Sequence, residues 1–145
     1  MQDPNQNVSI RPMENLLSLI TAGYCLVITF ILWMSVSSYQ STWPLPALYF
    51  VEMAALSILG PFTFSKRYRA GIIINWVVVG IIGVFSLVGA MTVGFFYLPI
   101  ALIFAFISIT FDLRNKEPIA THLSICIIAA LIQVVMMTAA IRLLN

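Results

Sequence analysis

Charged side chains are scarce in this chain. Seven of its 145 residues are Lys or Arg and five are Asp or Glu, so 8% carry a formal charge, against roughly 25% in soluble domains. Because a soluble protein of this size needs a charged shell, the composition excludes a separate soluble domain. The mean hydropathy of +1.04 agrees. A net charge of +2 is also too small to indicate nucleic-acid binding.

Residues that could perform chemistry are few as well. The chain has one histidine, His122, and two cysteines, Cys25 and Cys126, both within apolar stretches, where thiols react poorly. It has no glycine-rich phosphate loop, no G-x-S-x-G and no H-E-x-x-H motif. A zinc or haem site usually needs more than one strong ligand. We therefore expect no enzyme, no cofactor and no metal.

Long apolar runs, by contrast, are abundant. Residues 71–111 form one almost unbroken apolar stretch that ends at Asp112. As a single helix it would be about 62 Å long, roughly twice the hydrocarbon core of a bilayer, so it has to fold back on itself. Gly94 permits a turn and Pro99 suits the first turn of a new helix, which predicts a break around residues 92–97.

The remaining sequence adds a polar tail and three more apolar segments. Residues 1–15 are polar, and SSYQSTWP (37–44) is rich in turn-forming residues. The sequence predicts an all-α, polytopic integral membrane protein in which a single transmembrane domain, 16–145, forms a compact bundle of five transmembrane helices. The predicted spans are about 16–37, 45–64, 71–91, 95–112 and 119–144.

Ser35-Val36-Ser37 leaves a four-helix alternative open, because it resembles a signal-peptidase site after an apolar run. The run of about 19 residues, however, exceeds the 7–15 of a signal sequence. We expect the first helix to be retained.

The basic residues predict the orientation of the chain. If the loops of the five-span chain alternate between the two sides of the membrane, Arg142 falls on one side and the other six basic residues fall on the opposite side. A four-span chain would place those six residues on both sides. The positive-inside rule then places the N-terminal tail in the cytoplasm and the C-terminus outside a plasma (inner) membrane. The residues that fall together are Arg11, Lys66, Arg67, Arg69, Arg114 and Lys116.

Glu52 is the most distinctive polar residue within a predicted span. It lies roughly 10 Å below the outer edge, where an ionised carboxylate costs several kcal/mol. No Lys or Arg shares that depth, so Glu52 either stays protonated or pairs with hydrogen-bond donors. Tyr49, one turn earlier, can donate its hydroxyl. Gln133 in the last span reaches a similar depth, and we predict a Glu52–Gln133 hydrogen bond.

These three residues, Glu52, Tyr49 and Gln133, are the candidates for a ligand or proton site. The alternatives are that they only hold helices together or contact another subunit. Small and soft side chains share the face of Gln133, which predicts helix packing, and branched aliphatic side chains on the opposite face predict lipid contact. The packing face carries Cys126, Ala129, Ala130, Met136, Met137 and Ala140, and the lipid face carries Ile128, Leu131 and Val135.

Three further polar residues are expected near the inner membrane surface. The positions of Asn75 and Trp76 indicate interfacial anchors, and that of His122 indicates a solvated surface histidine. Between them and the outer side, a ridge of small residues predicts close helix packing. It consists of Gly80, Gly83, Ser86, Gly89 and Ala90.

The sequence leaves the function undetermined among three classes. A non-catalytic accessory or assembly subunit, packing laterally in the bilayer against a membrane protein partner or itself, fits the short loops and small-residue faces best. An oligomeric small-solute or proton-linked transporter using Glu52 is the alternative. An intramembrane enzyme has only Asp112, His122 and Glu52 to use, and these are expected at different faces of the membrane.

Overall fold

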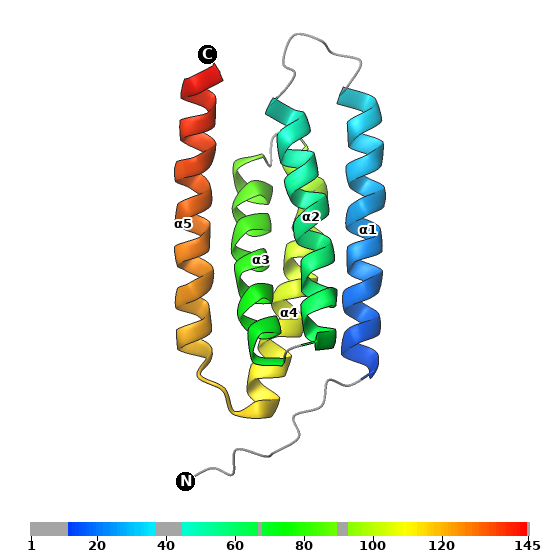
Figure 1. Cartoon of the computed structure of the whole chain (residues 1–145), viewed down its shortest axis with the longest axis vertical. Coiled ribbons are helices and arrows are strands. Elements are labelled where there is room, and N and C mark those ends of the chain that lie inside the picture. The colour runs from blue at the N-terminus through cyan, green and yellow to red at the C-terminus, as the bar shows by residue number, and fades with distance from the viewer. Residues whose placement is uncertain (1–11, 37–44, 67, 90–92, 145) are drawn as a thin grey trace.

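The structure, a computed structural model, describes residues 12–36, 45–66, 68–89 and 93–144. This part of the chain is all-helical, and its helices lie side by side along a common direction (Figure 1). They are α1 (Pro12–Val36), α2 (Leu45–Lys66), α3 (Tyr68–Val88), α4 (Leu98–Asn115) and α5 (Ile119–Leu144), with the 3-10 helix η2 (Gly94–Tyr97) before α4. Most of the predicted polar tail, the break at 37–44, and Arg11, Arg67 and Ala90 lie outside the described residues.

Four of the helical segments are long and apolar enough to cross a membrane. Within the described residues they are Met13–Ser35, Ala70–Val88, Gly94–Asn115 and Ile119–Leu143. The apolar part of α2, Ala47–Phe62, is shorter. Several helices extend a few residues past the predicted spans, since charged and polar residues such as Lys66 and Arg114 continue a helix after the apolar run has ended.

The long apolar stretch does fold back on itself. Helix α3 ends at Val88 and α4 begins at Leu98, with Pro99 in its first turn, so the predicted break is confirmed. The Gly94 N–H donates to the Gly89 carbonyl at 2.8 Å. A Cβ on Gly94 would lie 2.5 Å from the Gly89 carbonyl carbon. The turn therefore requires glycine because the two backbone segments approach so closely.

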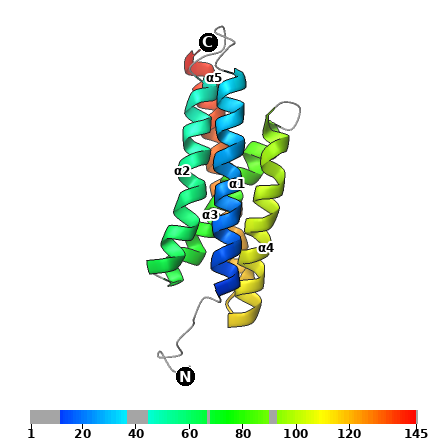
Figure 2. The same cartoon turned by 90° about the vertical axis from the view of Figure 1, so that its right-hand side faces the viewer.

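Helix α3 is the centre of the bundle. It packs against α2, α4 and α5, whereas α1 packs on α2 and α4 (Figures 1 and 2). Its core side chains include Val78, Ile82 and Phe85, which meet Phe104 of α4 and Met53 of α2 in one apolar cluster. Helix α5 packs almost entirely on α3, and most of its surface is left uncovered.

The α3–α5 contact depends on small residues, as the sequence predicts. A Cβ on Gly80 would lie 2.3 Å from the Cys126 carbonyl oxygen, so α5 rests directly on the backbone of α3. A Cβ on Gly83, by contrast, would have no atom of a neighbouring helix within 4 Å, so Gly83 is not part of the contact.

The two predicted faces of α5 are confirmed, with one exception. The buried residues include Ala129, Gln133 and Met137, and the exposed ones include Ile128, Leu131 and Val135. Met136, which the sequence places on the packing face, is 59% exposed.

Replacing Gly80 should therefore separate α5 from α3. We expect Gly80→Ala to destabilise the protein by about 1–3 kcal/mol, because a methyl group there overlaps a backbone carbonyl that cannot rotate away. Equilibrium unfolding in detergent measures the change. Gly83→Ala is the matched control, in the same helix with open space around it, and should leave stability unchanged or slightly raised. Equal losses in both variants would contradict the close contact.

Candidate functional site

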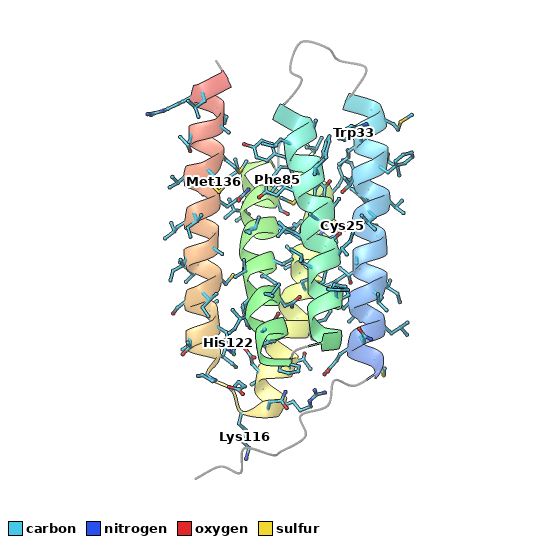
Figure 3. The ribbon with its side chains drawn as sticks, in the orientation of Figure 1. Cys25, Trp33, Phe85, Lys116, His122 and Met136 are labelled. Carbon is cyan, nitrogen blue, oxygen red and sulfur yellow. The ribbon has the colours of Figure 1, made fainter. Side chains whose placement is uncertain are left out.

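The carboxylate of Asp112 joins three helices on one oxygen atom. Its Oδ2 accepts the indole N–H of Trp76 at 2.9 Å and lies 2.9 Å from Nδ1 of His122. Trp76 belongs to α3, Asp112 to α4 and His122 to α5, so this cluster fastens the three helices together at the end of the bundle where α4 turns into α5 (Figure 3 labels His122). Asp112 is fully buried.

The backbone of the α4–α5 turn places His122 over Asp112. Lys116 adopts a left-handed conformation, φ 56° and ψ 31°, and ends α4 with its N–H bonded to the Asp112 carbonyl. Glu117 donates to that carbonyl as well, at 3.1 Å. The Pro118 carbonyl then accepts from Thr121 and His122 in the first turn of α5. The connection is so short that the first turn of α5 is held beside the last turn of α4.

A second polar contact lies one helical turn farther into the bundle. The Asn75 amide donates from Nδ2 to the Phe104 carbonyl at 3.2 Å and to Oγ of Ser108. Ser108 in turn donates to the Phe104 carbonyl at 2.9 Å. Asn75 precedes Trp76, and Ser108 precedes Asp112 by four residues, so a continuous polar seam runs between α3 and α4.

Two oxygen atoms in this seam are buried without a hydrogen-bond partner among the described residues. They are Oδ1 of Asn75 and Oδ1 of Asp112. The Asn75 oxygen lies against α2, 3.2 Å from where a Cβ on Gly60 would be. Buried acceptors are normally satisfied in proteins, and an exception points to an ordered water, an ion or a proton-dependent role.

The expectation that His122 is a solvated histidine is wrong, and Asn75 and Trp76, which are expected as interfacial anchors, face the interior of the bundle. Asn75 is 0% exposed, Trp76 2% and His122 7%. Asp112 lies inside the bundle within α4, and Trp76 and His122 face it from α3 and α5. One sequence feature could have predicted this cluster. Ser108 and Asp112 are four residues apart, so they share one helical face, and Asn75 and Trp76 form a polar pair in the preceding span.

The predicted hydrogen bond between Glu52 and Gln133 is present. Gln133 Nε2 donates to Glu52 Oε2 at 3.1 Å. Gln133 is buried and Glu52 is partly buried. Since α2 and α5 otherwise touch at few places, this bond is the main polar link between them. This bond is separate from the Asp112 cluster: Gln133 lies just past the middle of α5, whereas His122 lies in its first turn.

Tyr49 does not donate to Glu52. Its hydroxyl is buried and has no hydrogen-bond partner in the described part of the chain. The Tyr49 ring instead packs on Phe85, with centroids 5.8 Å apart. Phe85 also meets Tyr97 edge to face at 5.3 Å, and the Tyr97 hydroxyl lies 2.9 Å from Thr29 Oγ1. Tyr49 thus belongs to an aromatic layer that connects α2, α3 and the start of α4.

Helix α1 is tied to the bundle by polar contacts in its first turn and in its later half. Thr29 holds its later half to Tyr97, and Glu14 in its first turn forms an ion pair with Arg114 of α4. Between these two contacts, Cys25 is fully buried and directs its thiol toward the Met53 carbonyl of α2 at 3.8 Å. Both cysteines are free thiols.

Two grooves on the surface are lined almost entirely by apolar side chains. One, of about 340 Å³, lies between α1 and α4 and includes Leu17 and Phe106. The other, of about 290 Å³, lies between α1 and α2 and includes Phe30 and Phe50. Neither is lined by Glu52, Asp112 or His122. These two grooves are therefore separate from the polar clusters.

Comparisons with known proteins add no function to this geometry: no family model, no curated protein and no solved structure matches the chain. Among the described residues, no three His, Cys, Asp or Glu side chains come together as a metal site would require. The candidate sites therefore rest on the contacts alone, namely the Asp112 cluster and the Glu52–Gln133 pair.

The hydrogen bond from Trp76 to Asp112 should be a measurable part of the stability. We expect Trp76→Phe to cost about 1–3 kcal/mol, because a buried carboxylate loses one of its two donors while the aromatic ring is kept. Unfolding in detergent gives the value. The same exchange in an Asp112→Leu background should cost much less, since the acceptor is already gone. Equal costs in the two backgrounds would show that the bond contributes nothing.

Proposed function

We propose that this chain is a multi-pass protein of the plasma membrane that crosses the bilayer five times and serves as a non-catalytic accessory subunit, binding a larger membrane protein laterally. The observation that carries the proposal is that polar side chains join the helices to one another, whereas the outer faces of the bundle are apolar. Two buried or partly buried carboxyl groups, those of Glu52 and Asp112, are used in bonds between helices. The outer faces, above all that of α5, are apolar and uncovered.

The arrangement of the helix ends supports a cytoplasmic N-terminus. The start of α1, the α2–α3 junction and the α4–α5 turn lie at one end of the bundle, and the end of α5 lies at the other (Figure 1). Lys66, Arg114 and Lys116 belong to the first end and Arg142 to the second. This is the asymmetry that the positive-inside rule describes for a chain with its C-terminus outside.

The contacts of α1 support its retention as a membrane helix. Ser18, Thr21, Ala22 and Cys25 are buried along one side of it. A cleaved signal sequence would leave these contacts, and the Glu14–Arg114 ion pair, without a partner. The four-helix alternative would thus remove the ion-pair partner of Arg114.

Helix α5 is the surface we assign to the partner. It rests on α3 alone for most of its length, so both of its flanks face outward. Leu131 and Val135 are 61% and 66% exposed and lie on the side away from α3. A helix attached by one face offers a long, unobstructed strip for van der Waals packing, which is what joins helices in lipid.

Site-specific photo-crosslinking in the membrane tests this assignment. A photoreactive residue in place of Leu131 should yield one discrete cross-linked product with a larger protein, which copurifies in mild detergent at fixed stoichiometry. The same residue in place of Phe30, equally exposed but on α1, is the matched control and should give no such product. Cross-links only to lipid, or only to a second copy of the chain, would contradict the accessory role.

Transport past Glu52 is the alternative, and one observation favours it. Glu52 is only partly buried, only its Oε2 is bonded to Gln133, and no described Lys or Arg is bonded to it. Carboxylates at such depth in a membrane often take part in proton or ion movement. In this class the chain would act as an oligomer around Glu52, with Tyr49 and Gln133 beside the transported species.

Substitution of Glu52 separates the two functions. Under the accessory role, Glu52→Gln should keep both stability and partner binding, because an amide oxygen still accepts the bond from Gln133. Glu52→Leu should lose about 0.6–1.7 kcal/mol as that bond disappears. Proton flux into reconstituted vesicles is the second measurement. Flux in the wild type that Glu52→Gln abolishes would overturn the accessory role in favour of transport.

A further inference from the structure

The imidazole ring of His122 is fixed by one nitrogen and left open at the other. Nδ1 faces the Asp112 carboxylate at 2.9 Å. No hydrogen bond within the described chain uses Nε2. The side chain is 9% exposed, whereas that of Asp112 is fully buried, so the ring is the part of the cluster that reaches the surface.

Asp112 determines which ring nitrogen carries hydrogen. A carboxylate oxygen can only accept, and Oδ2 already accepts from Trp76. Nδ1 must therefore be the donor to it, which leaves Nε2 of the neutral ring as a free lone pair. A histidine held in this way by a carboxylate is oriented to accept at its outer nitrogen, which is the arrangement that makes such a histidine a base or a ligand elsewhere.

The charged residues that the structure describes around the pair make other contacts. Helix α3 contributes the uncharged Asn75 and Trp76. Arg114 of α4 is ion-paired with Glu14 of α1. Lys116 and Glu117 belong to the turn and bond to the Asp112 carbonyl through their backbone N–H groups. Among the described side chains, His122 is the basic group that lies on the buried carboxylate.

We propose that His122 is a proton-binding site at the α4–α5 end of the bundle, with Asp112 as its positioning residue and counter-charge. One proton from water adds to the lone pair of Nε2, and no other bond forms or breaks. The proton adds one positive charge to the ring, and the hydrogen bond between α4 and α5 gains a charged donor. This site is separate from Glu52 and from the partner surface on α5, and it goes beyond the accessory role.

Nitrogen NMR can read this site directly, because His122 is the only histidine in the chain. The full-length protein, labelled with ¹⁵N-histidine and placed in lipid nanodiscs, is observed from about pH 9 to about pH 5. We expect Nδ1 to be protonated throughout and Nε2 to gain its proton as the pH falls. A neutral ring with its hydrogen on Nε2, or an Nε2 that never gains a proton while the protein stays folded, would overturn the proposal.

Variants at Asp112 separate positioning from simple packing. Asp112→Asn keeps an acceptor oxygen and should keep the hydrogen of the neutral ring on Nδ1, whereas Asp112→Leu removes the acceptor and should move it to Nε2. Glu117 is an acidic residue of the same turn, and the control variant Glu117→Gln should leave the spectrum unchanged. An Asp112→Leu spectrum identical to the wild type would contradict the role of Asp112. If that variant does not fold, the wild-type titration alone still decides whether Nε2 binds a proton.

Discussion

The buried carboxylate of Asp112 is the constraint on which the arrangement of α3, α4 and α5 depends. An ionisable group in apolar surroundings is costly unless hydrogen-bond donors surround it. Trp76 and His122 satisfy one of its oxygens from two different helices. Both donors must stay within hydrogen-bond distance of the carboxylate. A shift of α3 or α5 along α4 would therefore leave a buried carboxylate without one of its donors. The interaction therefore fixes the relative heights of three helices.

Backbone contact of small residues sets the spacing that this polar cluster requires. Gly80 lets the Cys126 carbonyl approach α3 so closely that a side chain there would overlap it. Cys126 is one helical turn from His122 and two turns before Gln133, so the close contact lies between the two polar links of α5. Apolar burial adds little preference for one helix over another in lipid, since acyl chains are equally apolar. Shape at Gly80 and hydrogen bonds at His122 and Gln133 together specify where α5 binds.

The parts of the fold that follow from length and charge could be predicted from the sequence. The hairpin over 71–111 follows from a stretch too long for one crossing, and the Glu52–Gln133 bond follows from two polar groups at equal depth in antiparallel helices. The Asp112 cluster could not be found in the same way. A charged residue after an apolar run is expected to end the helix, yet α4 continues to Asn115. Whether such a residue turns inward depends on donors from other helices, and single-helix patterns contain no information about them.

Under the proposed accessory role, the same polar groups would keep the uncovered surface of α5 in one orientation. A helix attached along a single face would normally be free to rotate or slide, and a partner would then meet a variable surface. Here His122 holds one end of α5 to α4, and Gln133 holds its later half to α2. Two hydrogen bonds at different heights and on different neighbours prevent both rotation and translation. Leu131 and Val135 are thus held on the side of α5 that faces away from α3.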